Sequence, residues 1–218
     1  MADRNTRTQR WLALQLAGVA GFVDVVGYLT LHHLFTAHLT GNASKLGVAL
    51  GHGRLADAGP LAAVPVLFAF GVAAGTVLAD AGLAWAALAA QFCLVATFMG
   101  YGSTVIHHGF GPAETSAPFY GLAALATVAL GLQTAALTRI DGATVRTSYV
   151  SGMITRLAQG VVRRDRSGIP LLLLAVIPVV YVAAATLGAW MLGRTGVWCL
   201  GVPLGALAVA CVIAARVL

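Results

Sequence analysis

The stretch WLALQLAGVAGFVDVVGYLTL, residues 11–31, is apolar over most of its length and carries one formal charge, at Asp24. A helix needs roughly 20 apolar residues to cross the ~30 Å hydrocarbon core of a bilayer. The apolar runs are continuous rather than alternating, which argues against membrane strands. Five more stretches of the same kind follow, at about 60–82, 84–106, 117–138, 170–192 and 196–217. The sequence therefore predicts an all-α, polytopic transmembrane helix bundle with six long spans.

The composition is typical of a chain whose solvent is lipid. Of 218 residues, 59% are hydrophobic and 9% are charged, whereas a soluble domain carries roughly 25% charged residues. The net charge of +6 reflects 13 Lys and Arg against 7 Asp and Glu. No basic face with interleaved aromatic residues accompanies this charge, so nucleic-acid binding is not expected.

No pattern in the chain is typical of an enzyme or a metalloprotein. The GxSxG, HExxH, P-loop and dinucleotide-binding fingerprints are absent, and the three cysteines lie in apolar runs without CxxC spacing. His32, His33, His107 and His108 fall on one side of the predicted membrane, but adjacent histidines give poor ligand geometry for a metal ion. We therefore expect no catalytic residues, no cofactor and no metal.

Two shorter apolar stretches lie between the long ones, at about 38–52 and 149–162. At about 1.5 Å per residue each reaches only ~21 Å, which is too short to cross a bilayer comfortably. Each is compatible with a re-entrant half-helix, an interfacial helix or a short span. If both crossed, the chain would have eight spans, and Lys45 and Arg156 would enter the membrane.

The distribution of basic residues favours six spans. With a cytoplasmic N-terminus, only Lys45, Arg54 and Arg194 fall outside. The remaining ten fall inside: Arg4, Arg7, Arg10, Arg139, Arg146, Arg156, Arg163, Arg164, Arg166 and Arg216. Because basic residues are enriched in cytoplasmic loops, we expect both termini on the cytoplasmic side.

The chain, a single membrane domain over residues 1–218, resembles itself at an offset of 110 or 111 residues. The two repeats cover about 11–106 and 117–217. With three crossings in each half, the second repeat enters from the opposite side and the repeats are inverted, as in many secondary transporters. Four crossings in each half would make them parallel. The matching pairs include Gly21 with Gly131, Thr40-Gly41 with Ser151-Gly152, Leu46 with Leu157 and Pro60 with Pro170.

Asp24 is the one acidic residue within the first span. A carboxyl group at the bilayer centre costs roughly 2.5–3.5 kcal/mol on insertion scales, so it must face the bundle, stay protonated or find a partner. Two roles are open for Asp24. It is either a site for a proton, a cation or the substrate, or a protonated structural carboxyl that bonds a neighbouring helix.

The two short stretches begin with polar residues. Thr40 and Ser151 are predicted N-caps, and the N-terminus of a half-helix offers N–H donors and a partial positive charge to an anion or a carbonyl. The two tips either meet at mid-membrane and line one cavity, or they cap ordinary interfacial helices. The tip residues are His38, Thr40, Gly41 and Asn42 in the first stretch and Thr147, Tyr149, Ser151 and Gly152 in the second.

Gln91 and Gln133 place amide groups in the third and fourth long spans. Gln133 lies in the segment Gly131–Ala135, the counterpart of Gly21–Val25 around Asp24. One half therefore carries an amide where the other carries an acid. Substrate binding and plain hydrogen bonding between helices both fit this pattern.

The motifs around these residues resemble a known family. AGFVDVVG at 20–27 and LTGN at 39–42 are similar to the first signature of the YoaK-like bacterial membrane proteins, and GLQTA at 131–135 and VRTSYVSG at 145–152 are similar to the second. The resemblance covers essentially the whole chain. It implies a bacterial inner-membrane protein of about six helices, and it implies no solute because the family is labelled as one of unknown function.

Together these features predict a small secondary transporter or channel-like permease for a small polar or anionic solute, with proton coupling through Asp24 as one form of it. The alternative is a non-transporting scaffold or assembly partner, packed through small-residue pairs such as Gly71/Gly75 and Gly201/Gly205. The expected partners are the lipid bilayer and the solute, and the small size of the chain is compatible with a homodimer. The candidate substrate-binding residues are Asp24, His38, Thr40, Gly41, Asn42, Gln133, Thr147, Tyr149, Ser151 and Gly152.

Overall fold

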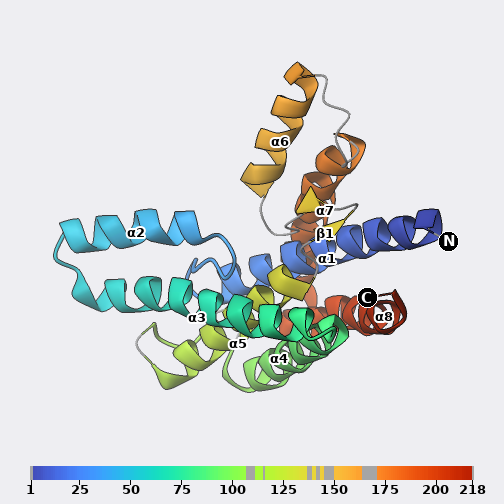
Figure 1. The fold of residues 1–218 in the computed structure, drawn as a ribbon. Coiled ribbons are helices and arrows are strands. Elements are labelled where there is room, and N and C mark those ends of the chain that lie inside the picture. Colours follow the sequence, from blue (N-terminus) through green and yellow to red (C-terminus); the bar gives the residue numbers. More distant parts are fainter. Residues whose placement is uncertain are drawn as a thin grey trace.

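A computed structural model describes residues 2–106, 111–114, 116–136, 139–140, 143–144, 150–163 and 171–217 as a helical bundle (Figure 1). The long helices are α1 (Ala2–Thr30), α3 (Leu55–Asp80), α4 (Ala84–Val105), α5 (Ala117–Ala136), α7 (Leu171–Thr195) and α8 (Gly201–Val217). The short ones are α2 (Leu39–Gly51), α6 (Val150–Arg163) and the 3₁₀ turn η1 (Gly196–Leu200). Two-residue strands β1 (Arg139–Ile140) and β2 (Ala143–Thr144) pair antiparallel. The predicted fold class, an all-α transmembrane bundle with two short helices, is confirmed.

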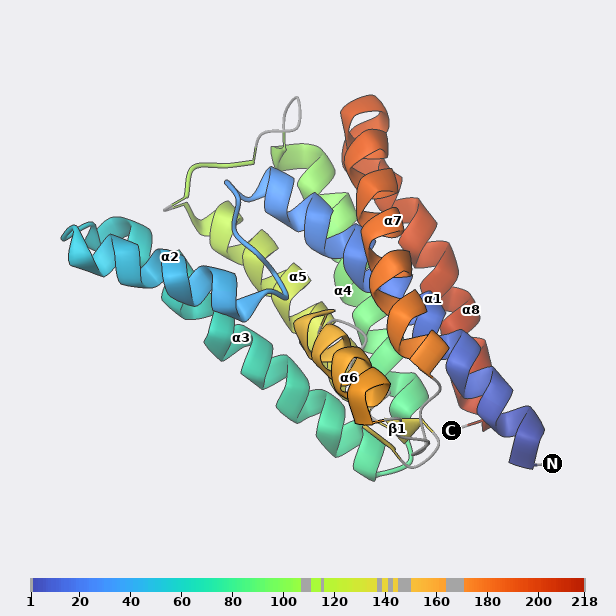
Figure 2. The same cartoon turned by 90° about the horizontal axis from the view of Figure 1, so that it is seen from above.

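Five stretches of the described chain are long and apolar enough to cross a membrane. Four of them correspond to α1, α3, α4 and α5, and the fifth, Leu171–Arg216, contains both α7 and α8. The turn η1 interrupts this fifth stretch after Gly196, whose φ of 58° is a left-handed conformation that glycine tolerates. Figure 2 shows α8 running back beside α7. The chain is thus a multi-span membrane protein, and the count of six crossings stays a prediction.

Helices α1 and α5 lie at the centre of the bundle. α1 packs against α7 and α8, α5 packs against α3 and α4, and α4 also packs against α8. Large apolar side chains on the outer helices, such as Phe70 on α3 and Leu172 on α7, are exposed. Exposure of this kind is expected where the surrounding solvent is hydrocarbon.

Glycines bring the backbones of two helix pairs into close contact. A β-carbon on Gly21 of α1 would collide with the backbone carbonyl oxygen of Tyr181 on α7. A β-carbon on Gly131 of α5 would lie 2.6 Å from the carbonyl oxygen of Phe68 and 3.0 Å from the Cα of Gly71, both on α3. The crossings of α1 with α7 and of α5 with α3 therefore depend on the absence of a side chain.

Three predicted helix starts are wrong. α3 begins at Leu55, so Pro60 lies inside it rather than in its first turn; the proline removes one hydrogen bond near the helix end. α2 begins at Leu39 with His38 as its N-cap residue, so Thr40 is not the cap. α6 begins at Val150, which places Ser151 inside the first turn. Pro170 lies outside the described residues.

Both short helices pack on the second long helix of their own half. α2 packs against α3, and α6 packs against α7. In Figure 1 each short helix has its N-terminal end toward the bundle and its C-terminal end away from it. The segment that connects α1 to the N-terminal end of α2 carries the most extensive polar contacts in the described chain.

Candidate functional site

Asp24 holds the segment that leads into α2. Its Oδ1 atom accepts three hydrogen bonds, from the Thr36 N–H at 2.9 Å, the Thr36 hydroxyl at 2.7 Å and the Ala37 N–H at 2.9 Å. These donors belong to the segment that precedes α2. The Gly41 and Asn42 N–H groups in the first turn of α2 bond to the His38 carbonyl oxygen instead, so Asp24 binds the approach to the helix rather than its N-terminus.

The second oxygen of Asp24 ties the same segment to α7. Oδ2 accepts hydrogen bonds from His38 Nδ1 at 2.7 Å and from the Tyr181 hydroxyl at 2.8 Å. An ionised carboxylate only accepts hydrogen bonds and has about four lone-pair sites, so these five donors leave no acceptor site of Asp24 unused. We call the cluster of Asp24, Thr36, His38 and Tyr181 the Asp24 latch.

The latch lies near one end of the span rather than at its middle. Asp24 is six residues before Thr30, the last residue of α1, or about 9 Å along the helix axis. The carboxylate is 3% exposed and Thr36 is fully buried. The expectation that Asp24 faces the bundle and finds partners is confirmed.

Asn42 closes the segment between α1 and α2. Its Oδ1 accepts from the Phe35 N–H at 3.2 Å, and its Nδ2 donates to the Phe35 carbonyl oxygen at 2.6 Å. A side-chain amide that bonds both groups of one residue acts like a neighbouring strand. Gly41 also meets Phe35, since a β-carbon there would lie 3.1 Å from the ring. The LTGN motif therefore shapes this loop.

The charge of Asp24 acts on His38. The hydrogen bond to Asp24, with the attraction between the two charges, raises the pKa of His38 above its ordinary value, although partial burial acts in the opposite direction. The Nδ1–H of His38 is directed to the carboxylate in either protonation state, which leaves Nε2 for an incoming group.

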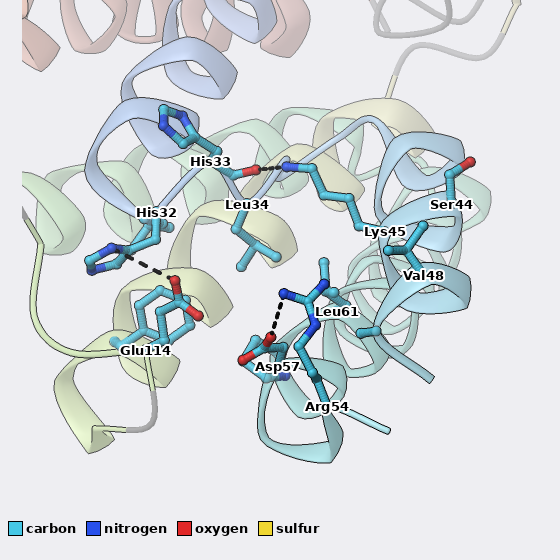
Figure 3. Close-up of a pocket in the computed structure, with 14 residues that line it drawn as sticks. His32, His33, Leu34, Ser44, Lys45, Val48, Arg54, Asp57, Leu61 and Glu114 are labelled. Atoms are coloured by element: carbon cyan, nitrogen blue, oxygen red, sulfur yellow. Dashed lines mark hydrogen bonds and ion pairs between the residues drawn. The ribbon is translucent and has the colours of Figure 1, made fainter. Parts of the chain in front are cut away.

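A cavity of about 450 Å³ opens on the other side of this loop (Figure 3). Its lining comes from the turn after α1, from α2, from the start of α3, and from the segment before α5 and the first turn of α5. Two of its carboxylates are engaged: Asp57 lies 3.5 Å from Arg54, and Glu114 lies 3.8 Å from His32. His32 and His33 have φ values of 51° and 62°, which non-glycine residues rarely adopt. The labelled lining residues are His32, His33, Leu34, Ser44, Lys45, Val48, Arg54, Asp57, Leu61 and Glu114.

Lys45 projects into this cavity from α2. Its ammonium group donates to the His33 carbonyl oxygen and lies 5.3 Å from the ring centroid of Tyr28 and 5.0 Å from that of Phe35. Phe35 in turn lies 5.5 Å, centroid to centroid, from His38. A single aromatic side chain therefore stands between the lysine of the cavity and the imidazole of the Asp24 latch.

In the contacts that the structure describes, the Gln133 amide of the second half bonds to groups on helices. Gln133 on α5 accepts from Gln91 Nε2 at 2.6 Å and donates to the Leu16 carbonyl oxygen at 2.8 Å. Both glutamines are buried. The Gln91 Oε1 atom has no hydrogen-bond partner among the described residues. These contacts join α4, α5 and α1, so the alternative of hydrogen bonding between helices is confirmed for Gln133.

The second tip does not join the first in the described structure. Ser151 is exposed on α6 and Gly152 is partly exposed, whereas Thr147 and Tyr149 lie outside the described residues. All residues that line the 450 Å³ cavity belong to the segments 31–61 and 114–119. None of the first-tip residues His38, Thr40, Gly41 and Asn42 lines this cavity, so it is not the cavity that one of the two alternatives placed between the tips.

Sequence analysis missed Thr36, Tyr181 and Lys45. Thr36 and Lys45 have no distinctive spacing from Asp24, and Tyr181 is separated from it by 157 residues. The one signal was the pair of matching glycines, Gly21 and Gly131, which mark where helices cross. Only the α1–α7 crossing shows that Tyr181 is the residue opposite Gly21.

The fold and this cluster define a helical, multi-span membrane protein with a carboxylate-latched loop at its first long helix. Residues 12–213 match the family described as "Protein of unknown function (DUF1275)", and the chain belongs to that family. Over 50 residues, or 23% of the chain, it is 52% identical to the "UPF0700 transmembrane protein YoaK" of Bacillus subtilis (strain 168). That stretch covers 20% of the relative's length. No solved structure matches the chain. The predicted YoaK-like resemblance is confirmed.

Proposed function

We propose that the protein is a small secondary transporter or channel-like permease for a small polar or anionic solute. The observation that carries this proposal is the Asp24 latch, in which one buried carboxylate fastens a loop between an open cavity and the bundle interior. A loop that bonds one buried titratable group through several donors can be loosened by a change at that group. The loop would serve as the gate between the cavity and the bundle.

The charges of the cavity support an anionic solute. Asp57 and Glu114 are paired with Arg54 and His32, while Lys45 donates to a backbone carbonyl rather than to a carboxylate. An anion that enters can take Lys45 as its partner, with His33 beside it. From there the path to His38 runs past Phe35.

Proton coupling through Asp24 follows from the chemistry of the latch. Both N–H groups that bind Oδ1 can only donate, so protonation of the carboxylate replaces an acceptor by a group that must itself donate. At least one of the five bonds would then be lost. A proton on Asp24 would loosen the loop, and an arriving solute would compete for the same donors.

We propose that the two halves form an inverted repeat, an arrangement that recurs among secondary transporters. α1 packs on α7 as α5 packs on α3, and α2 packs on α3 as α6 packs on α7, so the contacts of one half recur with the halves exchanged. The equivalent close crossings are Gly21 with Tyr181 and Gly131 with Gly71, each displaced by 110 residues. In Figure 2 α1 and α5 run in opposite directions, as inversion requires.

The location we propose is the bacterial inner membrane, with cytoplasmic N- and C-termini. Figures 1 and 2 place both termini at the same end of the bundle, in keeping with an even number of crossings. The ten basic residues of the predicted inner side support this orientation. The exposed face of α8 could also serve as the interface of a homodimer.

The test is electrical recording on proteoliposomes. Protein in vesicles is exposed to nitrate, inorganic phosphate, acetate and glycine in turn, with and without a proton gradient. We expect a current for at least one anion and its loss in Asp24→Asn. Asp80→Asn, at the exposed end of α3, is the matched control and should conduct like the parent chain. Equal currents in both variants would remove Asp24 from transport.

The scaffold alternative has one observation in its favour. A β-carbon on Gly201 or Gly205 of α8 would meet no described atom within 4 Å, so α8 presents an unfilled small-residue face that a partner helix could cover. On this alternative, Asp24→Asn is tolerated and Gly205→Leu abolishes co-purification of the partner. Absence of current for every solute, together with this pattern, would favour the scaffold.

A further inference from the structure

A second cavity lies at the opposite end of α1 from the latch. It is a groove of about 220 Å³ between the start of α1 and the start of α7. Two arginines and five apolar side chains line it, and no acidic residue does so among the described residues. The lining residues are Arg7, Arg10, Trp11, Leu14, Leu172, Leu173 and Val176.

The order of residues along α1 gives this groove a polar end and an apolar end. Positions 7, 10, 11 and 14 follow the i, i+3, i+4, i+7 spacing and share one helix face. The candidate span begins at Thr6, so the arginines lie in its first turns, at the level of lipid headgroups. Leu14 lies about 10 Å further along the axis than Arg7, within the hydrocarbon.

Exposure shows that the apolar lining faces outward. Trp11 is 72% exposed and Leu172 is 75% exposed, whereas Leu173 beside them is buried. A tryptophan at this depth has an apolar ring for acyl chains and an N–H for the interface. The groove thus has two arginines at one end and continues onto an apolar surface that faces the lipid acyl chains.

We propose that this groove is a binding site for one anionic phospholipid. The guanidinium groups of Arg7 and Arg10 would bind the phosphate, which they match in geometry and charge, and an acyl chain would lie along Trp11, Leu172 and Val176. A water-soluble anion would use only the arginines and would leave the apolar lining unused. The proposal does not depend on transport by the Asp24 latch.

The test uses Trp11 as a local reporter. Trp85, Trp190 and Trp198 are replaced by Phe, and the protein is reconstituted in phosphatidylcholine with a rising fraction of brominated phosphatidylglycerol or brominated phosphatidylcholine. We expect brominated phosphatidylglycerol to quench Trp11 at a much lower fraction than brominated phosphatidylcholine. In R7Q/R10Q the preference should fall about 25-fold, since each basic contact contributes about a fivefold factor.

Two control variants separate the site from general charge and from misfolding. R216Q removes an exposed positive charge near the C-terminus and should keep the preference, and R7K/R10K should keep most of it. Equal quenching by the two brominated lipids in the parent chain would overturn the proposal, because it indicates annular lipid only. A preference that survives in R7Q/R10Q, or that R216Q abolishes equally, would overturn it as well.

Discussion

Asp24 and Gln133 occupy nearly equivalent places in the two halves of the chain, yet they bind different kinds of partner. Asp24 fastens a loop, through Thr36, Ala37 and His38, and reaches one helix, through Tyr181. Gln133 bonds only to groups on helices in the contacts described here, with one partner on α4 and one on α1. One half therefore carries a carboxylate that binds a loop, and the other carries an amide that joins helices in the contacts described here.

The physical difference lies in what each group can exchange. A carboxylate changes its hydrogen-bonding character when it takes up a proton, whereas a primary amide does not titrate. The Asp24 side chain can therefore respond to a change in pH, whereas the Gln133 side chain cannot. Three predictions use this contrast, from the largest effect to the smallest.

Removal of the two polar groups, Asp24 and Gln133, should show the largest difference in stability between the two halves. Asp24→Ala leaves five donors without an acceptor and should lower the free energy of unfolding by about 3–5 kcal/mol. Gln133→Ala removes the hydrogen-bond partner of the Gln91 amide and of the Leu16 carbonyl oxygen. It should lower the free energy of unfolding by about 1–3 kcal/mol. Denaturant titration in detergent, followed by circular dichroism, measures both. Asp80→Ala serves as the exposed control, and a larger loss for Gln133→Ala than for Asp24→Ala would contradict the comparison.

The close helix crossings should behave alike in the two halves. Gly21→Ala and Gly131→Ala each force a β-carbon onto a backbone carbonyl of the opposing helix, and each should cost about 1–3 kcal/mol of unfolding free energy. Gly205→Ala, on an open face, should be neutral or stabilise by up to about 1 kcal/mol. The same titration applies. If only one of the two crossings is sensitive, the halves pack differently despite their matching glycines.

The pH dependence should be confined to the Asp24 half. The raised pKa of His38 means that its bond to Asp24 contributes stability below the ordinary value of 6.5, and that this contribution is lost as pH rises through the higher value of the folded protein. Relative to His38→Gln, the parent chain should therefore be more stable at mildly acidic pH, with the advantage vanishing at alkaline pH. Thermal unfolding across this range measures it. For Gln133→Ala the difference from the parent should not vary with pH.

Much of the fold follows from local patterns. Continuous apolar stretches predict helices wherever they exceed about 20 residues, and the short stretches at 38–52 and 149–162 became α2 and α6. Helix starts were less accurate. Pro60 lies inside α3, where it removes one backbone hydrogen bond close to the N-terminal end of the helix.

The site was predictable in part. A carboxyl inside an apolar run needs a partner, so Asp24 could be identified from the sequence alone as a residue with a special environment. The LTGN motif identified Asn42 as part of the same region. The role of Thr40 as an N-cap was wrong, because α2 begins at Leu39 and the Gly41 and Asn42 N–H groups bond to the His38 carbonyl oxygen. Where the helix begins depends on contacts between segments, which helix-capping patterns do not contain.

By itself the sequence determined the membrane environment, the helices and the presence of one acid that must be satisfied within the bundle, because hydropathy and the cost of a buried charge act on each segment separately. Only the tertiary structure decided which donors satisfy that acid. Gly21 allows α7 to approach until the Tyr181 hydroxyl reaches Asp24, and the turn at His32 and His33 returns Thr36 and His38 to the same carboxylate. These contacts depend on how the helices cross, and a crossing is a property of two surfaces together.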